Sequence, residues 1–275
     1  STGNTVVILK KYNDYDNVFI YNIENSGPAI ARNYGVSKSK GELIAFLDAD
    51  DIWEKEKVEK QVSYFRKYDS NLLITNVKII NEHDEVIGTQ EKSLPKSRKK
   101  QLIHFFQGKI TMNTPTIMVK RSVFDDIGGF NTELIHREDH FFLMQVSYKY
   151  GINLIEEHLV HRRRWNESMS SDVKRIKDNE KEIINFYHRT RYHFYDLSIE
   201  TFPFLKKYLS IEQGKSNSTL AMLLFRAGYI NGARDYMKSA IKNNFKMNYI
   251  LRLLFLYLPH YLRNYILKVY DKKNS

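Results

Sequence analysis

The sequence predicts an α/β protein with a mostly parallel sheet, followed by a region made only of helices. Three observations predict this order. Residues 42–47 form a near-continuous apolar run, which is typical of a strand buried on both faces of a parallel sheet. Further strands alternate with helical segments as far as His161, as they do in βαβ units. From Asp172 onward the helical pattern is uninterrupted.

Local signals support the first elements in turn. A short helix is expected over 5–12 and a strand over 19–23, where apolar and polar side chains alternate. Pro28 follows a turn residue and suits a first helical position, so a helix is expected to about Ser37. In the charged segment that follows the apolar run, three apolar residues at helical spacing predict a helix lying on the core. They are Val58, Val62 and Phe65.

The remaining elements of the front part follow from apolar runs and breakers. Gly128 and Gly129 end a helical turn, because a positive φ is easily adopted there. Glu138 and Asp139 begin an amphipathic helix. The expected order is strand 72–80, polar loop 92–101, short helix 102–106, strand 114–120, helical turn 122–127, helix 138–151, and strands 152–156 and 159–161.

Composition limits the class of protein. The chain has 275 residues, 43 Lys+Arg against 32 Asp+Glu, and 42% hydrophobic residues, which is typical of a folded globular protein of one or two domains. Cysteine is absent, which excludes disulfides and thiolate sites and fits a reducing compartment. Neither a signal peptide nor an apolar run of about 18 residues is visible. We therefore expect a cytoplasmic protein, at most peripheral on the inner face of the cell membrane.

The positive charge is unevenly distributed. Residues 1–158 hold 21 basic and 22 acidic side chains, whereas residues 159–275 hold 22 basic and 10 acidic ones. A near-neutral front half suits an enzyme core. A basic helical half suits an anionic partner such as membrane lipid, nucleic acid or an acidic glycan.

Two features mark the helical region. Residues 218–243 resemble half of a tetratricopeptide repeat, but a solenoid needs about three units, so a small helical cap is expected. Pro259 divides the apolar segment 249–270 into two helices, neither long enough to span a bilayer. One interpretation is an interfacial helix whose basic residues contact anionic lipid. The alternative is a helix packed on its own domain.

An acidic cluster follows the apolar run. Asp48, Asp50 and Asp51 lie beyond the carboxyl end of the expected strand, where open α/β sheets bind ligands. Three carboxylates so close together repel one another unless a cation lies among them, and their hard oxygen atoms favour Mg²⁺ or Mn²⁺. A solvated helix-capping loop is the alternative.

Several motifs together resemble a known family. Residues 27–33 and 41–51 resemble the nucleotide-sugar-binding core of family 2 inverting glycosyltransferases, which have the GT-A fold with a Rossmann-like mixed sheet. Residues 123–131 resemble the segment before the acceptor site of that family, and Glu138-Asp139 resembles its catalytic pair. The resemblance covers about residues 1–170 and implies a catalytic domain there, with a basic helical domain over 171–275.

The resemblance implies roles for individual residues. Asp48 would bind the ribose of a nucleoside diphosphate sugar, and Asp50, with Asp48 beside it, would hold the divalent metal. Arg32 would contact the nucleotide, or else form a structural ion pair. Asp139, with Glu138 next to it, would be the general base for the acceptor hydroxyl. The alternative for this pair is that both are simply favourable acids in a first helical turn.

The sequence departs from the family pattern in two places. It begins in what resembles the turn after the second strand of the family. The opening strand-helix-strand unit, with the aspartate that reads uracil, is therefore expected to precede it in a longer protein; otherwise the nucleotide pocket is incomplete. Trp165 stands where many members place a metal-binding histidine, and His161 substitutes only if the register shifts. Arg163 and Arg164 are candidates for the diphosphate, or part of a solvated basic stretch.

These features predict a metal-dependent, inverting glycosyltransferase that uses Mn²⁺ or Mg²⁺ and a UDP-linked or related sugar. The acceptor would be a glycan, a lipid-linked species or a glycoprotein in the synthesis of bacterial surface polysaccharide or glycoconjugate. The alternative is a non-catalytic basic module that binds an anionic membrane surface or polymer. No nucleic acid partner is expected, because no binding motif accompanies the basic residues. The helical cap is also a candidate surface for self-association.

Overall fold

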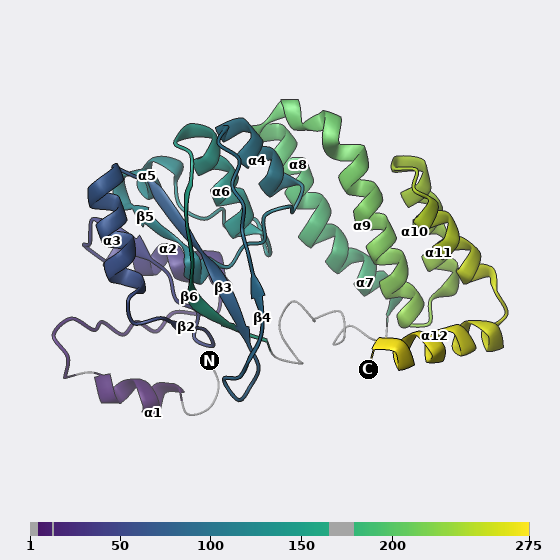
Figure 1. Ribbon diagram of the computed structural model, residues 1–275, viewed down its shortest axis with the longest axis horizontal. Coiled ribbons are helices and arrows are strands. Elements are labelled where there is room, and N and C mark those ends of the chain that lie inside the picture. Colours follow the sequence, from purple (N-terminus) through teal and green to yellow (C-terminus); the bar gives the residue numbers. More distant parts are fainter. Residues whose placement is uncertain (1–4, 13, 165–178, 275) are drawn as a thin grey trace.

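The computed structural model describes residues 5–12, 14–164 and 179–274. A sheet with helices on both faces forms the front part, and an arc of helices continues beside it (Figure 1). The front elements are α1 (Thr5–Leu9), α2 (Pro28–Lys38), β1 (Leu43–Ala45), β2 (Ile52–Trp53), α3 (Lys57–Tyr68), β3 (Leu72–Ile80), β4 (Val86–Gln90), α4 (Arg98–Phe106), β5 (Met118–Lys120), α5 (Arg121–Ile127), α6 (Glu138–Lys149) and β6 (Asn153–Arg163).

The helical region follows in sequence and in space. Its elements are α7 (Glu180–Tyr187), a π-helical turn (His188–Tyr192), α8 (His193–Thr201), α9 (Lys206–Arg226), α10 (Ile230–Asn243), α11 (Met247–Tyr257) and α12 (His260–Asn274). The expected helix pair is present as α9 and α10, and Pro259 separates α11 from α12 as expected. Among the described helices, none combines the length and the apolarity that a bilayer crossing requires.

The sheet is mixed, with strand order β1-β5-β3-β6-β2 and β4 paired to β3. Of the pairings among described strands, β3 with β6 is parallel, and the others are antiparallel. The prediction of a mostly parallel sheet was therefore wrong. So was the prediction that residues 42–47 form a strand buried on both faces, since β1 pairs with β5 at one edge and Leu47 is 50% exposed. An apolar run indicates burial, but it does not indicate the direction of the neighbouring strand.

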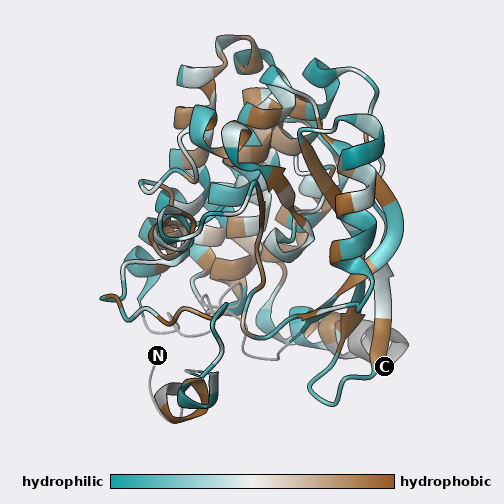
Figure 2. Cartoon of the chain, turned by 90° about the vertical axis from the view of Figure 1, so that its left-hand side faces the viewer, coloured by the Kyte–Doolittle hydropathy of each residue, from teal (hydrophilic) through white to brown (hydrophobic). Residues whose placement is uncertain are grey.

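Alternating side chains of the strands divide the core into two layers. Leu73 of β3 and Met118 of β5 pack with Phe65 of α3 on one face. Leu72 of β3 and Val119 of β5 point to the other face, which the helices α4, α5 and α6 cover. Figure 2 shows hydrophobic strands inside, flanked by helices of mixed hydropathy. The predicted core role of α3 is confirmed for Phe65, whereas Val58 is 44% exposed.

Several expected elements differ in detail. Residues 19–23 are extended and exposed and form no strand, because alternation alone does not provide a partner backbone. The strand expected over 114–120 is a short 3-10 turn followed by β5, and the two strands expected after Gly151 are one strand, β6. The strands β2 and β4 were not anticipated, and α4 begins at Arg98, inside the loop expected over 92–101, because Ser97 caps the helix there. The helices expected over 5–12, 28–37 and 138–151 and the strand 72–80 are confirmed.

The helical region contributes to the core of the front part. Phe194 and Tyr195 of α8 pack on Phe106 of α4, with ring centroids 6.3 and 5.6 Å away. A separate core lies farther along the chain and joins α7, α9, α10 and α11. The first helices after β6 therefore hold the helical region against the front part by apolar contact.

Candidate active site

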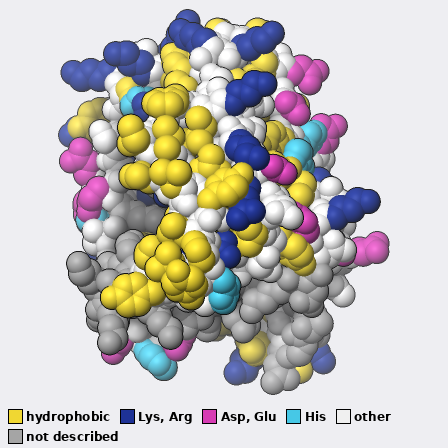
Figure 3. Space-filling model, turned by 90° about the vertical axis from the view of Figure 1, so that its right-hand side faces the viewer, with side chains coloured by type: hydrophobic (Ala, Val, Ile, Leu, Met, Phe, Trp, Pro, Cys, Tyr) yellow, Lys and Arg dark blue, Asp and Glu magenta, His cyan; other side chains and the backbone are white. Residues whose placement is uncertain are grey.

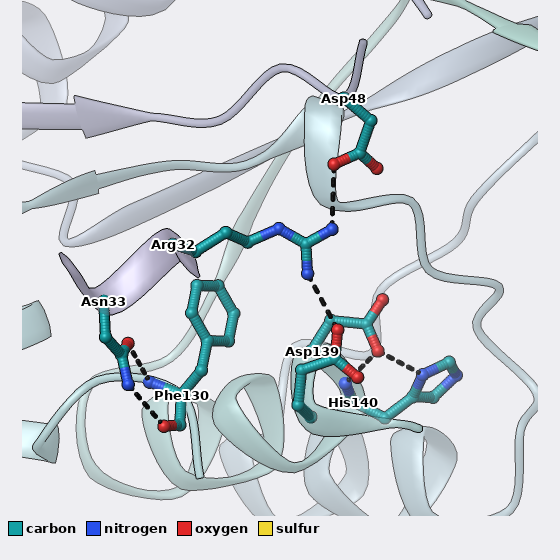
Figure 4. Close-up of polar contacts among 7 residues, drawn as sticks. Arg32, Asn33, Asp48, Phe130, Asp139 and His140 are labelled. Carbon is teal, nitrogen blue, oxygen red and sulfur yellow. Dashed lines mark hydrogen bonds and ion pairs between the residues drawn. The ribbon is translucent and has the colours of Figure 1, made fainter. Parts of the chain in front are cut away.

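Arg32 joins the two acidic motifs of the sequence (Figure 4). Its Nη2 donates to Asp48 Oδ1 at 2.8 Å, and its Nη1 donates to Glu138 Oε1 at 2.7 Å. The guanidinium carbon lies 5.7 Å from the centre of the Phe130 ring. One side chain from α2 thus connects the loop after β1 with the first turn of α6, and the ion pair considered for Arg32 is present.

Asn33 fixes the turn that leads to this cluster. Its Nδ2 donates to the Phe130 carbonyl oxygen at 2.8 Å, and its Oδ1 accepts from the Phe130 backbone N–H at 2.9 Å. Gly129 precedes this turn with φ +74°, and a Cβ there would lie 2.7 Å from Asn33 Oδ1. Only glycine therefore leaves room for the pair of hydrogen bonds that holds Phe130 beneath Arg32.

We expect Asn33→Ala to lower the free energy of unfolding by about 1–3 kcal/mol, because it leaves two polar groups of Phe130 unpaired. Urea unfolding checks this value. Ser37→Ala, on the same helix, is the control, since Ser37 is exposed and its hydroxyl donates to the Tyr34 carbonyl oxygen, three residues earlier in the helix. An Asn33→Ala protein as stable as the control would contradict the role of this contact.

The Glu138-Asp139 pair lies at the start of α6. Arg137, with φ +68°, turns the backbone into the helix. Asp139 Oδ1 accepts from the His140 backbone N–H at 2.7 Å and lies 3.1 Å from His140 Nδ1. In the described part of the chain no hydrogen bond to Asp139 Oδ2 is found, and the side chain is 17% exposed. One oxygen is therefore held in place while the other remains available to an incoming group.

The two neighbouring carboxyl groups differ in acidity. Burial, and then the charge of Asp139, raises the pKa of Glu138 to about 7, although Arg32 acts in the opposite direction. Burial acts to raise the pKa of Asp139 as well, but His140 and Arg32 outweigh it and lower that pKa to about 2. Asp139 is therefore fully ionised at neutral pH, as a proton acceptor must be, whereas Glu138 is ionised only in part.

The acidic loop after β1 contains carboxyl groups in three environments. Asp48 binds Arg32, Asp50 is exposed, and Asp51 Oδ1 accepts from the Arg163 backbone N–H at 2.9 Å. Burial, opposed by that hydrogen bond and assisted by the charges of Asp50 and Asp48, raises the pKa of Asp51 to about 6. The loop thus carries negative charge that the protein only partly compensates.

This donor set fits a hard divalent cation. Among the described residues no group of three or more His, Asp or Glu side chains converges as a ready metal site. Mg²⁺ needs no such group, because it is commonly held by one or two carboxylates together with phosphate oxygens of the substrate. Asp50 and Asp48 supply carboxylates of this kind from one loop.

The basic stretch at the end of β6 contacts the acidic loop through Arg163. The Arg163 side chain donates to the carbonyl oxygens of Asp50 at 3.1 Å and Asn81 at 2.9 Å, and it pairs with Asp84. It therefore clamps the acidic loop to the turn between β3 and β4. Arg164 donates its backbone N–H to Ile80, and its side chain is exposed.

Of the two residues considered for the additional histidine position, the structure describes His161. His161 Nε2 lies 2.7 Å from Glu54 Oε1, which in turn accepts from Lys78 Nζ at 2.8 Å. This ion-pair chain favours a structural role for His161. Trp165 lies outside the described residues.

Sequence reasoning missed two parts of this site. His140 was not recognised, although its place directly after Asp139 lets its ring return to that carboxylate. Arg137 gave no signal, because a residue other than glycine with positive φ has no clear sequence pattern. Its guanidinium carbon lies 4.8 Å from the centre of the Phe194 ring, so α8 contacts the residue that begins α6.

Comparisons with known proteins identify the family of the chain. Residues 1–128 match the family described as "Glycosyl transferase family 2". The chain is 30% identical over 213 residues to an uncharacterised glycosyltransferase of Methanocaldococcus jannaschii, covering 71% of this chain and 72% of the relative. It is 36% identical over 130 residues to the O-antigen biosynthesis glycosyltransferase WbnJ of Escherichia coli, covering 46% of this chain and 50% of WbnJ.

One solved structure supports the fold. S. aureus TarS 1–349 in complex with UDP-GlcNAc aligns with a TM-score of 0.52 and 19% identity, over 87% of this chain and 70% of that chain. The expected GT-A fold is thereby confirmed, with a helical C-terminal region after it. The joined acidic motifs, the family match and the archaeal relative together lead to one conclusion: the chain belongs to glycosyl transferase family 2 and is a glycosyltransferase.

Proposed function

We propose that the chain transfers a sugar from a nucleoside diphosphate donor to an acceptor hydroxyl, with inversion at the anomeric carbon. The proposal rests on the Arg32 bridge, which brings Asp48 of the acidic loop next to the Glu138-Asp139 pair. A donor bound at the loop and an acceptor at the start of α6 would then meet between them. Such positioning of two reactants supplies a large part of enzymatic rate enhancement.

On the donor side, Asp48 would bind the ribose, and Asp50, with Asp48 beside it, would hold Mn²⁺ or Mg²⁺. A cation held there would supply positive charge for the departing diphosphate. Arg32 orients Asp48 and adds positive charge next to the nucleotide. Arg163 keeps the loop in position through its contact with the Asp50 carbonyl oxygen.

On the acceptor side, Asp139 Oδ2 takes the proton of the attacking hydroxyl. The hydroxyl oxygen forms a bond to the anomeric carbon, while the bond from that carbon to the diphosphate oxygen breaks and its electron pair leaves with the nucleotide. Attack from the face opposite the leaving group inverts the configuration. His140 holds Asp139 Oδ1, so Oδ2 keeps a fixed direction towards the acceptor.

The substrates proposed are a nucleotide sugar and a glycan or lipid-linked acceptor of a surface polysaccharide. WbnJ is named for O-antigen biosynthesis, and TarS was solved with UDP-GlcNAc. Both names support this class for the present chain. We infer a UDP-linked donor on the same ground.

Asp50→Asn tests the metal contribution. We expect the transfer rate at fixed Mn²⁺ to fall by about 100-fold or more, because a metal supplies several kcal/mol of charge stabilisation. The Mn²⁺ concentration needed for half-maximal rate should rise with it. Both are measured by release of nucleoside diphosphate over a metal titration. Asp235→Asn on α10 is the charge-matched control, and an unchanged metal requirement in Asp50→Asn would contradict the assignment.

A further inference from the structure

A groove in the helical region lies between α9 and α12, away from the acidic motifs described above. It encloses about 1170 Å³. Met222 and Leu223 of α9 and Ile266 and Leu267 of α12 contribute apolar walls. A cavity of this size with apolar walls is large enough for a small amphiphilic molecule.

Three arginines line the same groove. Arg252 Nη1 donates to Ser218 Oγ at 2.8 Å, and Arg263 Nη1 donates to a backbone carbonyl oxygen at 3.2 Å. Arg226 is the third. Across the described residues none of the three forms an ion pair with a carboxylate, and Arg263 Nε is buried without a hydrogen-bond partner.

The positive charge of these three arginines is not balanced by a carboxylate of the described residues. Three guanidinium groups that share one groove repel one another, and a buried N–H without a partner is destabilising. A phosphate group in the groove offsets this repulsion, because guanidinium groups bind its oxygens with paired, charge-assisted hydrogen bonds. The chemistry of the groove therefore fits an anion joined to an apolar chain.

The surface next to the groove continues the apolar walls. Ile266 and Leu267 are 43% and 37% exposed, so the same side chains line the groove and reach the surface. Other exposed apolar side chains of α11 and α12 are Met247, Leu251, Leu254, Tyr257, Tyr261, Leu262 and Tyr265. Figure 3 shows apolar side chains gathered over this side of the molecule, with Lys and Arg beside them.

The charge of this segment has one sign. Residues 245–270 contain basic side chains and no acidic one. An amphipathic segment with apolar and basic groups and no carboxylate before Asp271 is complementary to anionic lipid. The bilayer interface has both the hydrocarbon and the phosphate that this face and this groove would contact.

We propose that the groove between α9 and α12 binds the phosphate head of a lipid, with the hydrocarbon chain lying along the exposed face of α11 and α12. Arg226 and Arg252 contact the phosphate, and Arg263 supplies the third donor. The site is separate from sugar transfer, because its ligand binds without a donor sugar or a metal. A failure of lipid binding would therefore leave the proposed function unaffected, and a failure of sugar transfer would leave the lipid site unaffected.

Dodecyl phosphate, below its micelle concentration, is the probe, and isothermal calorimetry gives its affinity. Inorganic phosphate tests the head alone, and dodecyltrimethylammonium tests the chain with the opposite charge. We expect dodecyl phosphate to bind at least about tenfold more tightly than either, since several buried CH₂ groups and the paired arginines contribute together. Equal affinity for inorganic phosphate would overturn the lipid assignment.

Variants locate the site. Arg226→Gln with Arg252→Gln should weaken dodecyl phosphate binding about tenfold or more, whereas Lys238→Gln with Lys242→Gln, which removes the same charge from α10, should not. Neither pair supplies a core side chain, and the thermal unfolding midpoint checks that both proteins fold. Equal binding by the two double variants would overturn the proposal.

Vesicles distinguish the source of the phosphate. We expect sedimentation with vesicles of phosphatidylcholine and phosphatidylglycerol, but not with phosphatidylcholine alone, and loss of it in the arginine double variant only. This result assigns the groove to a lipid in the bilayer. If the protein binds dodecyl phosphate but not vesicles, the groove takes a single dispersed lipid. If it binds neither dodecyl phosphate nor vesicles, the proposed site is contradicted.

Discussion

Asp139→Asn is expected to lower the transfer rate by about 100- to 10,000-fold, the contribution of a positioned general base. An amide oxygen still accepts the hydrogen bond from the His140 backbone N–H, so the first turn of α6 keeps its geometry. What is lost is the ability to take the acceptor proton. Donor binding should therefore change little, and the effect should appear in kcat.

The measurement pairs initial rates of sugar transfer with the affinity for the donor nucleotide. Asp196→Asn is the control, because Asp196 is an exposed acid in the first turn of another helix, α8. Its rate should equal that of the wild type. An Asp139→Asn enzyme that keeps a tenth or more of the wild-type kcat would assign the proton to another group.

Arg32→Gln is expected to reduce both stability and rate. The substitution breaks both ion pairs and leaves the Glu138 carboxyl group, whose side chain is 9% exposed, without its partner. Breaking a buried ion pair costs about 3–5 kcal/mol, and the partial exposure of Asp48 places this case near 3 kcal/mol. Urea unfolding measures the loss.

The pH profile separates a positioning role from a merely structural one. Arg32 lowers the pKa of both Glu138 and Asp139, so its removal raises both. The general base must be ionised, and the acid limb of kcat/KM should therefore move to higher pH in Arg32→Gln. Arg32→Lys keeps a positive charge but cannot bond both carboxylates in the same way, so we expect partial recovery. A profile that falls in height without moving would contradict this role.

Local signals in the sequence were sufficient for most of the helices. Pro28 marks the start of α2, and the two glycines after Ile127 have positive φ in the structure. These features depend on neighbouring residues rather than on distant ones, so the local sequence was enough to predict them. The direction of strand pairing was beyond such signals. The apolar run around Ile44 predicts that this residue is buried. The antiparallel partner of its strand, β1, lies more than 70 residues away in β5, and no local signal indicates it.

The site was predictable in part for the same reason. Asp48 and Asp50 follow a strand directly, so their position at the edge of the sheet follows from the local pattern. The bond from Arg32 to Glu138 joins residues 106 positions apart, and no spacing in the sequence indicates that contact. The contact of Arg163 with the acidic loop joins residues 113 positions apart, and the sequence offered only the diphosphate or a solvated basic stretch for this side chain.

The most direct test of the account is release of nucleoside diphosphate from a panel of nucleotide sugars, with and without Mn²⁺, by the wild type and by Asp139→Asn. Donor binding is read in parallel, because hydrolysis without an acceptor is slow. The account predicts that one donor binds in the presence of metal and turns over when acceptor is added, and that Asp139→Asn binds this donor without turnover. A well-folded protein that binds none of the donors would contradict the proposed chemistry.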